Sequence, residues 1–288
     1  MKTNAIIRIV LFSIAIVFLC GILLAALAFG LYSYRTDAYV YNQILPNAGD
    51  GTTNNGAADA DQIRNLDIEW VSGSITIQPD ENASEITLSE TYVEGTKNQM
   101  VYKQTGNTLK IQYCEDSITF PSFGINIDIS KDLVITVPAE WSCGELNIDA
   151  ASANIIVNEL SIQEVDFDGA SGTCDFNNCQ VDKMDIDGAS GDINFSGTLN
   201  ILDFDGASAS CYLEVTNVPS RISVDGMSGD LDLTLPEDCG FVVSIDAMSS
   251  NFQSDFPTTM SGGDYVYGDK RCRISFSGMS GDLNIRKG

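Results

Sequence analysis

The chain has 288 residues and carries 15 Lys and Arg against 40 Asp and Glu, a formal net charge of −25. Such a surface repels nucleic acid, whose binding depends on Lys and Arg that neutralise phosphates, so we expect no nucleic-acid partner. The sequence contains no histidine. This absence removes the most common general base and excludes Ser-His-Asp and Cys-His nucleophiles within the chain.

An uncharged apolar run opens the chain, from Ile9 to Leu31. As a helix it is long enough to cross a hydrocarbon core of about 30 Å. Lys2 and Arg8 precede the run, and positive charge favours the cytoplasmic side of a membrane. We predict a cytoplasmic tail over residues 1–8 and a single-pass transmembrane signal-anchor helix over residues 9–32, with the C-terminal part extracellular.

The same run has a second interpretation as a signal peptide, because Ala26-Leu27-Ala28 fits the small-residue pattern of a cleavage site. Cleavage would give a secreted protein. Residues 33–63 follow, and their stretch from Pro46 to Gln62 is rich in Gly, Asn, Ala and Asp. This composition predicts a flexible spacer.

One motif recurs after the spacer at a single phase. Each copy has an alternating apolar run that ends in Asp, then Gly-Ala-Ser-Gly, then a second alternating run, as in "MDIDGASGDINF" from Met184. The alternation predicts two short strands, and the Asp-Gly and Ser-Gly clusters predict a corner between them. A β-sandwich also has many short strands, but nothing in it requires this motif at one phase. The aligned serines are Ser72, Ser152, Ser171, Ser190, Ser208, Ser228, Ser249 and Ser280.

A repeat of this length is typical of a solenoid, in which each unit buries its apolar face against the next. We predict an all-β protein, a β-solenoid built as a single-stranded β-helix-like stack of coils of about 19–20 residues, preceded by one N-terminal transmembrane helix. The solenoid covers residues 64–288, with irregular coils over 64–141 and regular repeats over 142–288. The interruption from Gly262 to Lys270 predicts a hairpin or loop at the capping end.

Several stretches resemble a known family. They are "VSGSITI", "ASGDINF", "MSGDLDL", "MSGDLNI", "LPEDCGFVVSIDAMS" and the tyrosine-rich "GDYVYGD". Together they are similar to the bacterial putative-adhesin family of β-strand-repeat proteins, a domain of unknown function, over roughly residues 64–288. The resemblance implies a membrane-anchored bacterial surface protein with a β-helical ectodomain, and it transfers no catalytic residue.

The corner serines are the first candidate site residues. A serine nucleophile needs a base within hydrogen-bond reach, whereas this chain has eight equivalent serines and no histidine. We interpret the serines as structural turn residues whose hydroxyls bond the corner backbone, alone or in a ladder with their neighbours.

An aspartate precedes the corner in six copies, and stacking would place these carboxylates in one column with neighbours about 4.8 Å apart. Repulsion between them demands relief. Either each carboxylate accepts backbone N–H bonds at its corner, as in an Asx turn, or the column binds Ca²⁺ through its oxygens; no other cofactor is expected. The candidates are Asp149, Asp168, Asp187, Asp205, Asp225 and Asp246, with a second outward row at Asp166, Asp185 and Asp203.

Two further residue types require an interpretation. Cys174 and Cys211 share one inward repeat position, with Ile193 between them, so they lie beyond disulfide reach and we interpret them as small buried apolar groups. Tyr265 and Tyr267 predict cross-strand packing in a cap, and a binding patch for sugars is the alternative.

We predict a non-enzymatic, adhesin-like cell-surface protein that presents an acidic β-solenoid ectodomain to a protein or a cell-wall glycan. The alternative is an accessory protein of envelope-stress sensing that acts through a membrane partner, because the tail over residues 1–8 is too short for a signalling domain. A β-helical polysaccharide lyase is disfavoured, because basic residues cluster only at Lys270, Arg271 and Arg273.

Overall fold

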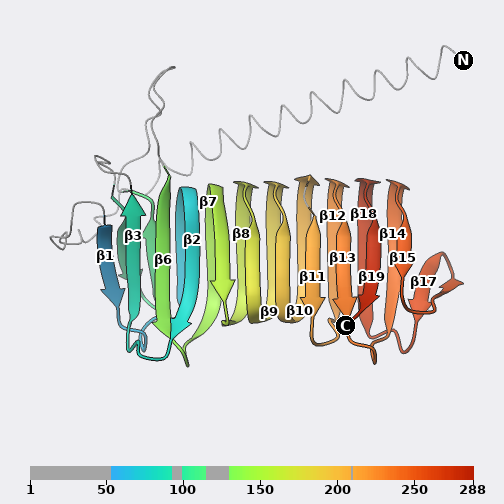
Figure 1. The fold of residues 1–288 in the computed structure, drawn as a ribbon, viewed down its shortest axis with the longest axis horizontal. Coiled ribbons are helices and arrows are strands. Elements are labelled where there is room, and N and C mark those ends of the chain that lie inside the picture. Colours follow the sequence, from blue (N-terminus) through green and yellow to red (C-terminus); the bar gives the residue numbers. More distant parts are fainter. Residues whose placement is uncertain (1–52, 93–98, 115–129, 209) are drawn as a thin grey trace, which may run out of the picture. The chain divides into compact units, whose positions relative to one another are not determined.

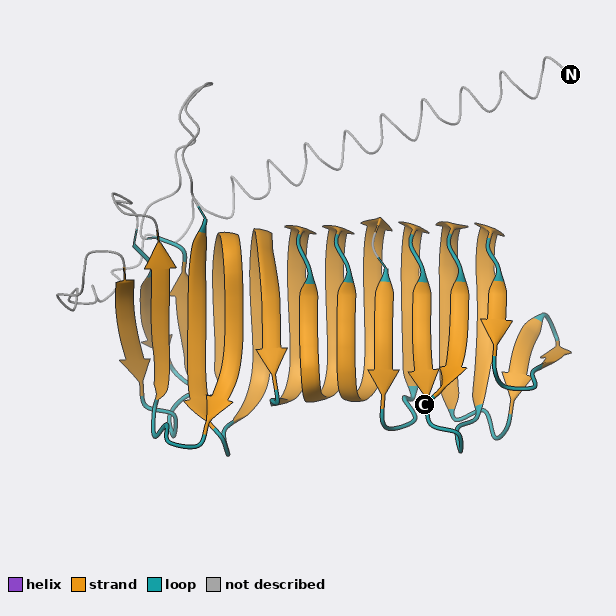
Figure 2. Cartoon of the chain, viewed as in Figure 1, coloured by secondary structure: helices purple, strands orange, loops and turns teal. Residues whose placement is uncertain are grey.

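The computed structural model describes residues 53–92, 99–114, 130–208 and 210–288. Within these ranges the protein is all-β and contains no helix (Figures 1 and 2), so the predicted fold class is confirmed in this respect. The predicted transmembrane segment over residues 9–32 lies outside the described residues. Among the described residues, no helix has the length and apolar character needed to cross a membrane.

The strands all belong to one compact unit. In chain order they are β1 (Thr53–Ala58), β2 (Asn65–Asp80), β3 (Ile86–Tyr92), β4 (Val101–Thr105), β5 (Thr108–Gln112), β6 (Lys131–Pro138), β7 (Ser142–Asn158), β8 (Ser161–Ser171), β9 (Cys174–Ser190), β10 (Ile193–Ser208), β11 (Cys211–Val215), β12 (Arg221–Ser228), β13 (Leu231–Leu235), β14 (Phe241–Ser249), β15 (Phe252–Ser254), β16 (Thr259–Ser261), β17 (Asp264–Tyr267), β18 (Cys272–Ser280) and β19 (Leu283–Lys287).

Successive copies of the repeat pair in parallel and in register. Ser152 pairs with both Ser72 and Ser171, and Ser208 pairs with both Ser190 and Ser228. The strand segments before the corner form a first sheet, and the segments after it form a second sheet. Because β2 and β7 continue through the serine corner, they contribute to both sheets.

The core lies between the two sheets, where the inward positions of each strand stack into apolar columns. Full burial of one such side chain stabilises the fold by about 1.5–3 kcal/mol. One column of the first sheet consists of Leu66, Leu146, Val165, Met184, Leu202, Ile222, Ile274 and Val243, and one of the second sheet consists of Ile75, Ile155, Cys174, Ile193, Cys211, Leu231 and Leu283, all buried.

The order of coils in space differs from the order in the chain at both ends. The last repeat, β18 and β19, pairs with β12 and β13 on one side and with β14 and β15 on the other. Figure 1 shows β18 between β12 and β14. At the other end β2 lies between β7 and the later strands β5 and β6.

Antiparallel strands finish both ends of the stack. β3 and β4 pair antiparallel with β6 and β5, and β1 pairs with β3. The prediction of a flexible spacer over residues 33–63 is therefore wrong for residues 53–63, where β1 extends the sheet and Ile63 is buried. At the C-terminal end, β16 and β17 form an antiparallel hairpin against the start of β14, as the interruption from Gly262 to Lys270 predicts. Tyr265 packs on Phe252 with ring centroids 4.4 Å apart, and Tyr267 packs on Phe241, so the two tyrosines act in cross-strand packing.

The corner at Ser190 requires glycine at the next position, whereas Ala153 and Ser250 follow the serine in other copies. Gly191 has a φ of 138°, which L side chains rarely adopt. A Cβ at this position would lie 1.9 Å from the carbonyl oxygen of Gly172 in the neighbouring coil. The corner therefore combines a backbone conformation and a close approach that only glycine allows.

We expect Gly191→Ala to lower the free energy of unfolding by at least about 1–3 kcal/mol, the typical cost of a strained backbone conformation. Urea denaturation followed by circular dichroism measures this loss. The matched control is Gly188→Ala in the same repeat, where the nearest atom to an added Cβ is 3.9 Å away. Equal stabilities of the two variants would contradict this account of the corner.

Candidate functional site

The outward face of the first sheet carries two neighbouring columns of acidic residues, which we call the acidic face. One column lies nearer the serine corner, and we call it the inner column. In it, Asp168 pairs with Asp149 and Asp187, and Asp205 pairs with Asp187 and Asp225. Asp166, Asp185 and Asp203 form the second column two residues earlier. On β2, Glu69 extends the inner column, and Asp67 is separated from Asp166 of the second column by Asn147.

The inner column departs from the predicted row of six aspartates. Asp225 and Asp246 are not neighbours, because both pair with Ser277 of the inserted last repeat. At the opposite end Glu69 pairs with Asp149 and lengthens the column. The inner column is therefore an uninterrupted run from Glu69 to Asp225, and Asp246 is separated from it by a neutral rung.

Three basic side chains are spaced along the acidic face. Lys110 Nζ lies 3.2 Å from Asp67 Oδ2 and 3.1 Å from Glu69 Oε1. Lys183 Nζ lies 2.7 Å from Glu164 Oε1 and 3.4 Å from Asp185 Oδ2.

The third base, Arg221, pairs with Asp203. Surface pairs of this kind contribute about 0–1 kcal/mol each, so they offset only part of the repulsion.

Desolvation and like charge both act on the inner column. Partial removal from water, followed by the charges of Asp168 and Glu69, raises the pKa of Asp149 to about 6. Desolvation and neighbouring carboxylates also raise the pKa values of Asp168, Asp187 and Asp205. Partial desolvation and neighbouring carboxylates together therefore make ionisation of the inner column less favourable.

The inner aspartates do not cap the corner, which corrects the predicted Asx turns. Within the described residues their carboxylates accept no backbone N–H bond. The caps come from the position two residues after the serine: Asp230 Oδ1 accepts from Asp282 N at 2.8 Å, and Asp282 Oδ1 accepts from Asn251 N at 3.1 Å.

This capping ladder was missed, although the sequence contains its signal. Every copy has a short polar side chain at that position, which is the residue type that bonds nearby backbone. The residues are Ser74, Asn154, Thr173, Asp192, Ser210, Asp230, Asn251 and Asp282.

The Ca²⁺ interpretation of the aspartates gains no support from the geometry. Across the described ranges, no group of three or more His, Cys, Asp or Glu side chains is arranged to hold a metal ion. Ca²⁺ binding by Asp149, Asp168, Asp187, Asp205, Asp225 and Asp246 stays a prediction.

The corner serines bond to the neighbouring coil. Ser171 Oγ donates to Ser152 Oγ at 3.3 Å and Ser228 Oγ to Ser208 Oγ at 3.4 Å. Ser190 Oγ donates to the carbonyl oxygen of Ala170 at 3.2 Å. These bonds run along the stack, as expected of structural turn residues.

The buried cysteines act as apolar core residues. Ile193 pairs with Cys174 on one side and with Cys211 on the other, as the repeat predicts. Burial raises the pKa of both thiols to about 12, so they stay protonated and unreactive at neutral pH.

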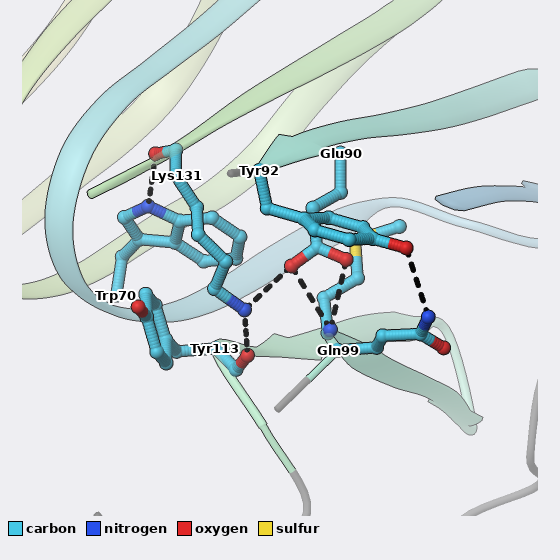
Figure 3. A network of polar contacts seen from close by, with 7 residues as sticks. Trp70, Glu90, Tyr92, Gln99, Tyr113 and Lys131 are labelled. Carbon is cyan, nitrogen blue, oxygen red and sulfur yellow. Dashed lines mark hydrogen bonds and ion pairs between the residues drawn. The ribbon is translucent and has the colours of Figure 1, made fainter. Parts of the chain in front are cut away.

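A buried ion pair closes the N-terminal end of the stack (Figure 3). Lys131 Nζ lies 2.5 Å from Glu90 Oε1, and both side chains are fully buried. Glu90 also accepts two bonds of 3.0 Å from Met100 N. Lys131 Nζ donates to the carbonyl oxygen of Tyr113 and lies 3.6 Å from the centroid of the Tyr113 ring.

This pair was not predicted from the sequence. Lys131 and Glu90 both occupy inward positions of alternating strands, in "KDLVITVP" and "ITLSETY". Polar residues in an inward register are the available signal, since an unpaired buried charge is not stable. Burial lowers the pKa of Lys131 against the opposing effect of Glu90.

We expect Lys131→Met to lower the free energy of unfolding by about 3–5 kcal/mol, because it leaves Glu90 buried without its counter-charge. The double variant Lys131→Met, Glu90→Leu should recover most of this loss. A double-mutant cycle by urea denaturation measures the coupling. A double variant as unstable as the sum of the single variants would contradict a specific pair.

We expect Asp149→Asn to be more stable than the native chain at neutral pH. A carboxyl with a higher pKa in the folded than in the unfolded state binds its proton more tightly when folded, so stability falls as the pH rises between the two values. For Asp149 this interval runs from about 3.9 to about 6.

Thermal melts at several pH values measure the effect: the Tm advantage of Asp149→Asn should be present above about pH 6 and vanish near pH 4. Asp182→Asn, an exposed aspartate outside both columns, controls for the loss of one charge. An advantage of Asp149→Asn that does not change with pH would contradict the electrostatic cause.

Several solved structures resemble this fold, and no curated protein matches the sequence. A protein from Bacteroides fragilis named as "a putative adhesin" is 14% identical with a TM-score of 0.51, over 84% of this chain and 100% of that chain. A "putative cell adhesion protein" from Clostridium sporogenes is 10% identical with a TM-score of 0.39, over 82% and 99%. A "putative lipid binding protein" from Parabacteroides distasonis is 14% identical with a TM-score of 0.36, over 83% and 98%.

At these identities, the likeness to the Bacteroides fragilis protein concerns the fold alone. The match to a protein family is more specific. Residues 63–200, from the start of β2 to the middle of β10, match the model of the family described as Toastrack DUF4097. Residues 63–200 thus match a Toastrack DUF4097 domain, in agreement with the resemblance that the repeat signatures carry.

Proposed function

We propose that this chain is a non-enzymatic, adhesin-like surface protein whose acidic face binds a positively charged partner. The observation that carries the proposal is the inner carboxylate column, in which acidic residues occupy successive rungs without interruption from Glu69 to Asp225. A column that served only the fold would not need charge at each rung. The Bacteroides fragilis protein of similar fold, which is named as a putative adhesin, supports this function.

The geometry favours a broad, repetitive contact. The carboxylates recur on successive rungs of one sheet at a spacing of about 4.8 Å. Closely spaced charges of one sign steer and hold a partner with the complementary charge pattern. The partner is therefore a protein or a cell-wall glycan that presents repeated amino or guanidinium groups.

The proposed topology places this face at the cell surface. In this proposal residues 9–32 anchor the chain as a single-pass helix and residues 33–52 act as a spacer. The stack, which begins with β1, lies outside the cell. Lys2 and Arg8 precede the helix, and their positive charge supports a cytoplasmic N-terminus.

Attachment assays with a gene-deletion strain test the proposal. The strain is complemented with the native full-length chain or with a variant whose acidic face is neutralised by Asp168→Asn, Asp187→Asn and Asp205→Asn. These carboxylates have raised pKa values, so their neutralisation is expected to preserve folding. We expect attachment to an amine-coated surface to fall about ten-fold and to weaken in high salt.

The control variant removes the same number of charges from the second sheet, through Asp132→Asn, Asp175→Asn and Asp232→Asn. Equal attachment by the face variant and the native chain would overturn the proposal. A deletion strain that attaches normally but is sensitive to cell-wall antibiotics would instead support the accessory role in envelope stress.

A further inference from the structure

A row of exposed methionines lies at the C-terminal end of the acidic face. The residue before the corner serine is Val or Ala in the first five copies of the repeat, at Val71, Ala151, Ala170, Ala189 and Ala207. In the last three copies it is Met227, Met248 and Met279, with exposed fractions of 39%, 84% and 45%. These exposed methionines are unusual in a chain whose apolar columns otherwise face inward and are buried.

The inserted last repeat makes the three methionines neighbours. Met227 and Met279 lie between the pairs Gly226–Gly278 and Ser228–Ser280 of β12 and β18. On the other side of β18, Met248 lies beside Met279 by the same register, between Ala247–Gly278 and Ser249–Ser280. The spatial order is therefore Met227, Met279, Met248, on consecutive rungs about 4.8 Å apart.

Thioether sulfur is a soft donor that prefers soft metal ions, in particular Cu(I), over Ca²⁺, Mg²⁺ or Mn²⁺. Methionine has three rotatable side-chain bonds, so sulfurs on adjacent rungs can converge on one ion. Two carboxylates, Asp225 and Asp246, lie two residues before Met227 and Met248 on the same outward face. Their negative charge favours a cation at the row.

We propose that Met227, Met279 and Met248 form a surface site for Cu(I), in which the three thioether sulfurs are the ligands. The site needs all three coils, because Met279 supplies the central ligand between the outer two. It is independent of the partner bound by the rest of the acidic face. Burial raises the pKa of four thiols to about 12, so they stay protonated and do not compete for the ion. They are the thiols of Cys143, Cys174, Cys211 and Cys272.

Methyl NMR of the full-length chain, labelled with [methyl-¹³C]methionine, tests the site. Ag(I) is the probe, because it has the ligand preference of Cu(I) and no redox chemistry under these conditions. The chain carries Cys114→Ser, which removes the one half-buried thiol of the described residues. We expect the methyl signals of Met227, Met248 and Met279 to shift together and to saturate at about one equivalent of Ag(I).

Met260 is the internal control, since it is 66% exposed but lies outside the row, on β16. Its methyl signal should not move with the other three. Separate titration of the three signals, or a shift of all exposed methionines alike, would overturn the proposal.

Substitution by leucine separates a metal site from an apolar contact surface. Met279→Leu keeps the apolar side chain and removes the central sulfur, and it should weaken Ag(I) binding at least about ten-fold. Met260→Leu should leave binding unchanged, and an unchanged Tm shows that both variants fold. If Met279→Leu bound Ag(I) as the native chain does, the row would not be a thioether site.

Discussion

In-register parallel stacking is the constraint on which the rest of this structure depends. Each side chain faces the residue at the same repeat position in the next coil, about 4.8 Å away. A repeat position is therefore a column, and its chemistry is multiplied along the stack. Leucine and isoleucine columns form a continuous core, and serine, asparagine and aspartate at the corner form ladders of hydrogen bonds. The same geometry brings carboxylates together when the repeated residue is aspartate.

The outward faces of the two sheets differ in the polar side chains that they stack. On the second sheet, Asn177 Nδ2 donates to Asn158 Oδ1 at 3.0 Å and Asn194 Nδ2 donates to Asp175 Oδ1 at 2.6 Å, so amides connect the coils without like charges. On the first sheet the carboxylates stay adjacent, and partial desolvation raises their pKa values. Neutral amide columns are compatible with the same backbone, so the fold itself does not require the charges of the acidic face.

Much of this architecture could be predicted from the repeat, because period and alternation fix what each residue faces. The placement of Ile193 between Cys174 and Cys211 follows directly from the phase of the copies. The position of the last repeat between β12 and β14 could not be predicted in this way. The sequences of β14 and β18 both fit the edge of β12, so the repeat pattern does not determine which of them pairs with it. Lys131 and Glu90 were recognisable as polar residues in an inward register, but the contact between them joins strands 41 residues apart.

The inserted repeat also affects how the end of the stack is assembled. β14 and β15 lie against β18 and β19, which follow them in the chain. Until β18 and β19 are synthesised, the coil of β12 and β13 has an open edge, and the coil of β14 and β15 has no parallel neighbour in the described structure. β18 and β19 therefore insert between two coils that precede them in the chain and join these coils into one stack. A chain cut short before β18 would lose two coils rather than one and would expose a strand edge that can pair with other molecules.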